Sequence, residues 1–150
     1  METTFENPKK YYTAGATITT PTTDPTRAGY RFKGWKVGTG HVPATITADD
    51  IKAKKSIVVK ADWTEVTYSI AWAGIDEDKN PNKSKTTWKA SEGEVTLQAP
   101  TTVDGKTFTE WTWKVEGGTD ATLAGGKLNT TNINVTTADT VKIIITANWE

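Results

Sequence analysis

The chain has 150 residues, and its 18 Lys and Arg are balanced by 18 Asp and Glu, so its net charge is zero when the single histidine is neutral. It therefore lacks the surplus of clustered cations with which proteins bind nucleic acids or anionic membrane surfaces. The absence of cysteine excludes disulfides, thiolate metal sites and a cysteine nucleophile. No apolar run reaches the roughly 18 residues that a membrane-spanning helix needs. The length suits one ordinary domain or two small ones.

The N-terminal part of the chain is expected to be mainly β. Residues 16–21, "ATITTP", predict a short strand closed by proline, because threonine favours a pleated, half-wet surface. Between Pro21 and Gly29, an aspartate that can cap and a proline that suits a first helical position predict one or two helical turns. Thr47–Asp50 has the spacing of a capping box and predicts another short turn.

Three later segments alternate apolar and polar residues, which is typical of strands with one buried face. They are "SIVVKADW" at residues 56–63, "VTYSIAW" at 66–72 and "VKIIITANW" at 141–149. The apolar residue types on one side of each segment are the expected core of the protein. The last segment is strongly apolar and stops abruptly, so we interpret the chain as a segment of a longer protein.

The stretch "GYRFKGW", residues 29–35, recurs as "GKTFTEW", residues 105–111, with Gly, Phe and Trp at the same spacing. The flanking segments recur in the same order, since "ATITTP" corresponds to "VTLQAP" and "SIVVKADW" to "VKIIITANW". Such self-similarity predicts a repeated structural unit. We therefore expect two units, residues 1–65 and 66–150, joined without a flexible linker, with the N-terminal strand of the first one shortened.

The repeated aromatic residues need an irregular strand to lie together. Phe32 and Trp35 are three apart and would point to opposite faces of a regular strand, but one extra residue in a β-bulge places them on the same face. Gly34 suits such a bulge because it tolerates positive φ, whereas Glu110 replaces it in the second motif. Large aromatics stabilise small cores by their buried area. The residues expected in the two cores are Phe32, Trp35, Trp63, Tyr68, Trp72, Phe108, Trp111 and Trp149.

With "TITTP", "TDPTRAGYRFKGW" and "VVKADW", residues 15–63 resemble the Listeria–Bacteroides repeat, also called the internalin B-repeat. The second unit diverges, because "PTTVDGKTFTEW" lacks the second Pro and the Tyr. The resemblance implies a mainly β (α+β) fold of two tandem, small β-grasp-like units, each with a short helix or helical turn. It also implies a secreted or bacterial cell-surface protein in which such units act as stalks or spacers and sometimes contribute to adhesion. The family has no catalytic residues or cofactor to carry over.

Candidate chemistry is sparse in this chain. His41 lies in a Gly/Pro-containing stretch without a nucleophile motif, and no phosphate-binding or catalytic signature is present, so we expect no enzyme activity. One stretch alternates oxygen donors as calcium loops do, but Pro81 and Thr87 stand where Gly and Glu are required. That departure favours a solvated hairpin tip. The calcium candidates are Asp76, Asp78, Asn80 and Asn82.

Carbohydrate binding is the alternative function that the composition leaves open. Seven Trp and four Tyr exceed what two small cores require, and an exposed aromatic cluster would indicate a binding site. Four aromatics that the patterns do not place inside are the candidates to face a ligand: Tyr11, Tyr12, Trp88 and Trp113. The sequence names no receptor, although a host or cell-surface protein or glycan is compatible with it.

Overall fold

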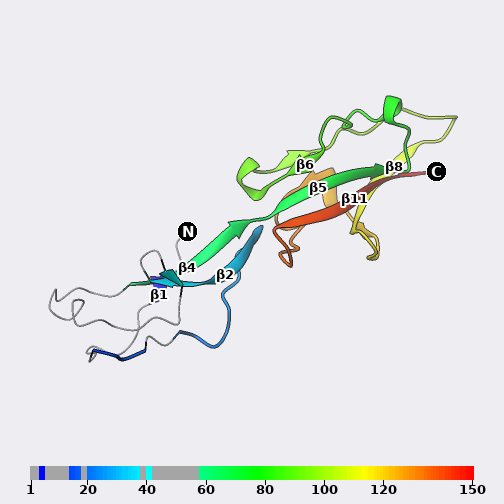
Figure 1. Ribbon diagram of the computed structural model, residues 1–150. Helices are drawn as coiled ribbons and strands as arrows, with labels where there is room; N and C mark the ends of the chain where they lie inside the picture. The colour runs from blue at the N-terminus through cyan, green and yellow to red at the C-terminus, as the bar shows by residue number, and fades with distance from the viewer. Residues whose placement is uncertain (1–3, 6–13, 18–19, 38–39, 42–57) are drawn as a thin grey trace. The chain divides into compact units, whose positions relative to one another are not determined.

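The computed structural model describes residues 4–5, 14–17, 20–37, 40–41 and 58–150 (Figure 1). The protein is mainly β and divides into two compact units. Unit 1 consists of Met1–Arg27 and Phe32–Thr64, and unit 2 of Ala28–Arg31 and Glu65–Glu150. Most of each unit thus lies on one side of the junction between Thr64 and Glu65, but unit 2 also includes four residues from earlier in the chain.

The described part of unit 1 contains a four-stranded sheet in the order β1-β4-β2-β3. The edge strand β1 pairs antiparallel with β4, and β3 pairs antiparallel with β2. Trp35 on β2 and Val59 on β4 are buried, so the two central strands supply the described core. The strands are β1 (Thr4–Phe5), β2 (Tyr30–Val37), β3 (Gly40–His41) and β4 (Val59–Glu65).

The helical turns expected between Pro21 and Gly29 are not formed. The chain there has bends, an isolated bridge and a turn that ends at Gly29, whose φ of 77° is left-handed. Only four residues separate Asp24 from Gly29, so few helical hydrogen bonds could repay the cost of nucleating a helix, and threonine has low helix propensity. The turn expected at Thr47–Asp50 lies outside the described residues.

Unit 2 is built on a five-stranded sheet in the order β6-β5-β11-β8-β9. The first and last long strands of the unit, β5 and β11, lie side by side and run parallel (Figure 1), in register from Thr67 opposite Thr140 to Ala73 opposite Thr146. The other neighbours pair antiparallel. The strands are β5 (Thr67–Ala73), β6 (Thr87–Trp88), β8 (Phe108–Val115), β9 (Ala121–Thr122) and β11 (Thr140–Trp149).

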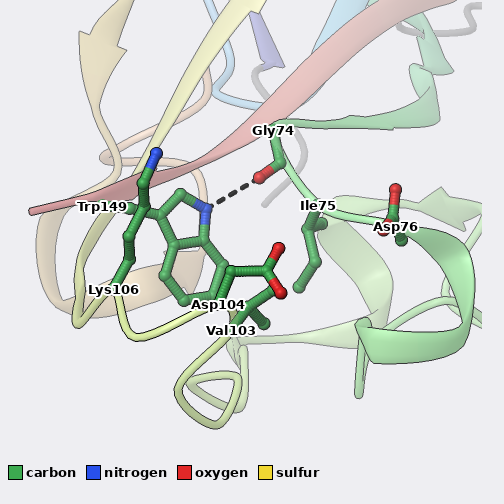
Figure 2. Close-up of a pocket in the computed structure, with 7 residues that line it drawn as sticks. All are labelled: Gly74, Ile75, Asp76, Val103, Asp104, Lys106 and Trp149. Carbon is green, nitrogen blue, oxygen red and sulfur yellow. Dashed lines mark hydrogen bonds between the residues drawn. The ribbon is translucent and has the colours of Figure 1, made fainter.

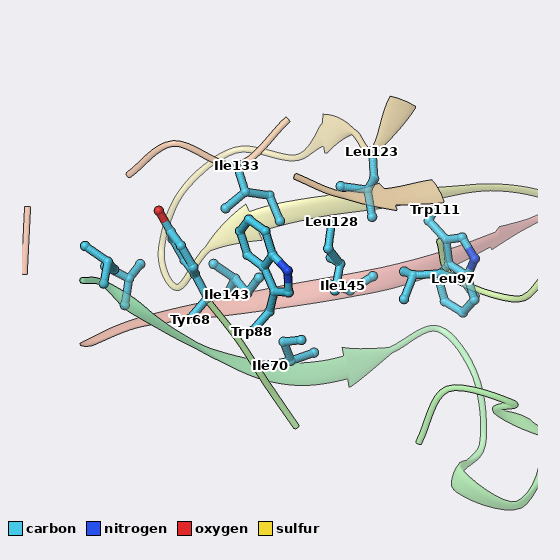
Figure 3. Packing of buried hydrophobic residues seen from close by; sticks show 13 residues of the cluster. Tyr68, Ile70, Trp88, Leu97, Trp111, Leu123, Leu128, Ile133, Ile143 and Ile145 are labelled. Carbon is cyan, nitrogen blue, oxygen red and sulfur yellow. The ribbon is translucent and has the colours of Figure 1, made fainter. Parts of the chain in front are cut away.

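The core of unit 2 lies against one face of this sheet (Figure 3). Alternate residues of β5 and β11 are buried, as their period of two requires. Leucines and an isoleucine from the connecting segments cover them, and in those segments β7 (Val95–Thr96) pairs with β10 (Lys127–Leu128). The largest fully buried side chains include Tyr68, Trp88, Leu123, Leu128, Ile133, Ile143 and Ile145.

Helical structure in the described residues is limited to three 3-10 turns, η1 (Glu77–Lys79), η2 (Ala90–Glu92) and η3 (Ala124–Gly126). The connection between β6 and β8, where a helix would cover the sheet, contains two glycines and a proline as well as several threonines, and these residues disfavour helix. No helix among the described residues is long and apolar enough to span a membrane.

A bulge of the kind predicted between Phe32 and Trp35 is present at the corresponding place in unit 2. Along β11, Asn148 lies opposite Glu110 while the next residue, Trp149, lies opposite Phe108, so Thr109 is the additional residue on β8. Phe108 and Trp111 are thereby brought to the same face. The bulge forms here without glycine. In unit 1 the residue corresponding to Glu110 is Gly34, whose φ is 125°.

Candidate functional site

An aromatic cluster forms around Phe32 in unit 1. The Phe32 ring meets the rings of Trp35 and Trp63 edge-to-face, with a centroid separation of 5.5 Å in both pairs. Trp35 is only 7% exposed, and Phe32 and Trp63 are partly buried. Edge-to-face pairs add about 0.5–1.5 kcal/mol to the stabilisation from buried area. Three residues from β2 and β4 therefore form one cluster of aromatic contacts.

Unit 2 contains the same arrangement of rings. Phe108 lies 5.1 Å from Trp111 and 5.8 Å from Trp149, measured between ring centroids. Trp111 also meets Trp72 edge-to-face at 5.5 Å. Although Trp111 is 3% exposed, its indole N–H has no hydrogen-bond partner in the described structure. The ring is thus held by apolar contact, which is a structural role.

Trp88 does not face a ligand, contrary to the expectation from sequence. It is 1% exposed and stacks on Tyr68, with ring centroids 5.5 Å apart. Its indole N–H donates to the Gly93 carbonyl at 3.0 Å, and the Tyr68 hydroxyl donates to the Val135 carbonyl at 3.1 Å. Burial raises the pKa of Tyr68. Sequence alone missed this because β6 is only two residues long and shows no alternation.

Of the other candidate ligand-facing aromatics, Trp113 is the one that the structure describes. Trp113 lies on β8 and is partly buried against the hydrophobic core of unit 2. Tyr11 and Tyr12 lie outside the described residues. The exposed large hydrophobic side chain found among the described residues is Val58, at 48%.

The candidate calcium loop uses its amide oxygens internally. Asn80 Oδ1 accepts from the Asn82 backbone N–H at 2.9 Å. The Asn82 side chain donates to the Gln98 carbonyl at 2.8 Å and accepts from the Gln98 N–H at 2.9 Å. Both asparagines are buried, whereas Asp76 and Asp78 are exposed. The asparagines therefore fasten this loop to the segment before β8, and no acidic or histidine cluster suited to a metal is found in the described part of the chain.

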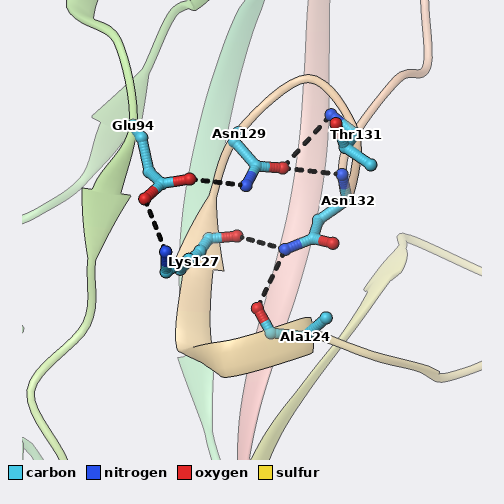
Figure 4. Close-up of polar contacts among 6 residues, drawn as sticks. All are labelled: Glu94, Ala124, Lys127, Asn129, Thr131 and Asn132. Atoms are coloured by element: carbon cyan, nitrogen blue, oxygen red, sulfur yellow. Dashed lines mark hydrogen bonds and ion pairs between the residues drawn. The ribbon is translucent and has the colours of Figure 1, made fainter.

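A polar cluster on the connecting segments is also satisfied internally (Figure 4). Glu94 pairs with Lys127 Nζ at 2.8 Å and accepts from the Asn129 amide at 3.0 Å. Both hydrogen bonds lower the pKa of Glu94, and the bond from Lys127 has the larger effect. Asn132 Nδ2 donates to the carbonyls of Lys127 and Ala124 at 2.8 and 3.1 Å. The cluster braces the segment that covers the core.

Unit 2 has a pocket of about 280 Å³ beside Trp149 (Figure 2). The indole N–H of Trp149 donates to the Gly74 carbonyl at 2.7 Å, which fixes the ring at the wall. The pocket thus combines an aromatic surface with two carboxylates and one ammonium group. Sequence reasoning placed Trp149 in the core and singled out Asp76 only as a calcium candidate. The lining residues are Gly74, Ile75, Asp76, Val103, Asp104, Lys106 and Trp149.

Comparison with known proteins adds one family. Residues 2–64 match the family model of the Listeria-Bacteroides repeat domain. That family occurs in bacterial surface proteins, and its domains are typically structural and non-catalytic. No curated protein and no solved structure matches the chain.

Proposed function

We propose, from the match of residues 2–64 to the Listeria–Bacteroides repeat, that the chain is a non-catalytic spacer segment of a bacterial cell-surface protein. In this proposal residues 66–150 are a divergent second copy of the repeat. The recurrence of one ring geometry supports it, because Phe32 and Phe108 each contact two tryptophans at matching positions of the repeated pattern. The central parallel pair in unit 2 is compatible with a β-grasp-like unit.

The proposed mechanism is mechanical, and it follows from the position of β5 and β11. β5 begins unit 2 and β11 ends it, and the two run parallel as neighbours. Tension applied through the chain would pull the start of β5 and the end of β11 in opposite directions along their axes. All hydrogen bonds of the ladder would then be loaded together. This geometry resists extension better than one in which the bonds break in turn, and it is the observation that carries the proposal.

Single-molecule pulling on the full chain tests this mechanism. The chain has no cysteine, so introduced thiols give unique attachment points. Handles at Thr67→Cys and Glu150→Cys load the β5–β11 ladder in shear. As a matched control, handles at Thr67→Cys and Thr140→Cys attach to two residues that lie opposite each other at the same end of the ladder, and they peel it apart. Forced unfolding reports the unfolding rate under load.

We expect the shear pair to need a several-fold higher force than the peeling pair. Similar forces in both geometries, at the level of the peeling control, would contradict a load-bearing spacer. Equal circular dichroism spectra and thermal midpoints for the two double variants would show that the fold is intact in both.

The pocket beside Trp149 supports the alternative function, carbohydrate binding. An indole surface with carboxylates nearby can contact a sugar through its ring face and its hydroxyl groups. A glycan panel titrated against the intact chain would change tryptophan fluorescence if the pocket binds one of them. Trp149→Phe should then abolish the response while Trp113→Phe keeps it. A panel that leaves the fluorescence of the intact chain unchanged would count against this alternative.

A further inference from the structure

A short stretch of the repeated motif is firmly embedded in unit 2. The Val66 backbone N–H donates to the Gly29 carbonyl at 2.9 Å, and the Gly29 N–H donates to Asn134 Oδ1 at 3.2 Å. A Cβ atom on Gly29 would lie 2.4 Å from the Ala90 Cβ and 3.2 Å from Thr130 Cγ2. Distances this short leave no room for a side chain. The segment Ala28–Arg31 therefore belongs to the packing of unit 2, as its assignment to that unit indicates.

Gly105 occupies the position of the second motif that corresponds to Gly29. It has the same left-handed backbone conformation, but no other described residue packs against it. Its φ of 74° matches the 77° of Gly29. A Cβ added at Gly105, however, would meet no atom within 4 Å. Val103 and Lys106 close the turn with backbone hydrogen bonds of 2.9 and 3.3 Å, and Asp104 also has a left-handed φ of 50°. These are the features of a tight two-residue hairpin turn.

The number of residues that follow the last tryptophan of each unit is also consistent with a repeated contact. Trp149 ends β11 and is followed by Glu150, and Trp63 lies near the end of β4 and is followed by Thr64. The next two residues after Thr64 are Glu65 and Val66. Suppose that a further copy of Glu65–Glu150 began directly after Glu150. The residue equivalent to Val66 in that copy would then stand in the same register to Gly105 as Val66 does to Gly29, whose carbonyl accepts from the Val66 N–H. Repeat proteins reuse one contact between successive copies of the repeated sequence in this way.

We infer that the turn Val103–Lys106 is a docking surface for a further repeat unit, which would contact Gly105 through the equivalents of Val66 and Ala90. The inference rests on the proposed function, because it treats unit 2 as one member of a repeat series. The pocket beside Trp149 is lined by three residues of the same turn, Val103, Asp104 and Lys106 (Figure 2).

The residues that follow the two glycines differ, but the differences are compatible with the same contact. Tyr30 contributes a hydrogen bond to the Glu65 carboxylate, and Lys106 stands at the position of Tyr30, where an ammonium group can donate to a carboxylate as well. Thr107 replaces Arg31, whose guanidinium pairs with Asp139 at 2.9 Å. That ion pair is exposed on both sides, and exposed pairs contribute little to stability.

The test adds a copy of Glu65–Glu150 directly after Glu150 of the full chain and compares Gly105→Ala with Gly117→Ala. Gly117 is a matched control, because its φ of 79° is also left-handed and a Cβ there would meet nothing within 4 Å. In the chain as it exists, both substitutions should lower the unfolding midpoint by the same small amount. In the extended chain, Gly105→Ala alone should destabilise the appended copy and remove hydrogen-exchange protection from its Val66 amide.

Equal behaviour of Gly105→Ala and Gly117→Ala in a folded extended chain would overturn the inference. An appended copy that does not fold would overturn it too, because the surface would then not accept the unit whose contacts define it. Both outcomes are independent of the pulling experiment on the unextended chain, so failure of the docking surface is distinguishable from failure of the spacer function.

Discussion

The two units keep the same aromatic contacts while changing the polar residues beside them. Phe32 with Trp35 and Trp63, and Phe108 with Trp111 and Trp149, show ring separations between 5.1 and 5.8 Å. In unit 1, Lys36 follows Trp35 and Asp62 precedes Trp63, and these two side chains form an ion pair at 3.0 Å. Unit 2 has at those positions a neutral hydrogen bond from Asn148 to Thr112, also at 3.0 Å.

This difference shows which interactions the repeated motif requires. Buried aromatic area stabilises by several kcal/mol, whereas a partly exposed ion pair contributes about 1 kcal/mol or less. The charged pair can therefore be exchanged for a neutral one with little loss, but the rings cannot. Substitutions at the tryptophans, the glycines, the polar pair and Glu65 test the comparison of the two units, in order of decreasing expected effect.

The largest effect is expected for the buried tryptophan of the repeated cluster. Trp111→Ala should lower the free energy of unfolding of unit 2 by about 3–5 kcal/mol, because it leaves a large cavity beside Phe108 and Trp72. Trp113→Ala, at a partly buried position two residues away, should cost clearly less. Urea unfolding followed by circular dichroism measures both. The ranking fails if the two variants lose the same stability.

The next largest difference is expected between the stabilities of Gly29→Ala and Gly105→Ala. Gly29→Ala and Gly105→Ala both place a side chain at left-handed φ, which costs about 1 kcal/mol. Gly29→Ala also forces a methyl group against Ala90 and should cost a further 1–3 kcal/mol or so by overpacking. Thermal unfolding of the two variants of the chain as it exists gives this difference. Identical midpoints would show that Gly29 is not tightly packed.

A smaller effect is expected when the polar pair of unit 1 is made like that of unit 2. The double variant Lys36→Thr with Asp62→Asn should lose less than about 1 kcal/mol, because both side chains are partly exposed. The loss should shrink further at high salt, which screens the original pair. Urea unfolding at low and high ionic strength checks this, and a loss comparable to that of Trp111→Ala would reverse the ranking.

The smallest effect concerns Glu65. Burial, the largest single influence, raises its pKa, but hydrogen bonds from Ser91 and Tyr30 and the charge of Lys89 together outweigh it, so that the pKa lies below the ordinary 4.5. A lowered folded-state pKa adds stability above about pH 4.5, and that stability is lost as the pH falls through the folded value. Glu65→Gln should therefore make the free energy of unfolding depend less on pH below about pH 4.5. Urea unfolding at a series of pH values measures this profile, and a profile that the substitution leaves unchanged would contradict this role of Glu65.

Much of the strand structure followed from patterns local in sequence. The alternation at residues 66–72 and 141–149 matches strands whose alternate residues are buried. The need to place Phe32 and Trp35 on one face predicted a bulge in the first motif, and a bulge is found at Thr109 in the second motif, where the replacement of glycine by Glu110 argued against one. In contrast, the helical turns expected between Pro21 and Gly29 are absent, because cap and stop residues without enough chain between them do not make a helix.

The sequence of this protein already establishes the repeated Gly-Phe-Trp spacing and the β character, because strand period acts over a few neighbouring residues. The burial of Trp88, the use of Asn82 to fasten Gln98 and the place of Gly29 beside Ala90 emerge only in the folded chain. The bond from Gly29 to Asn134, for example, joins residues 105 positions apart. Such contacts depend on how distant segments pack, and no local pattern encodes them.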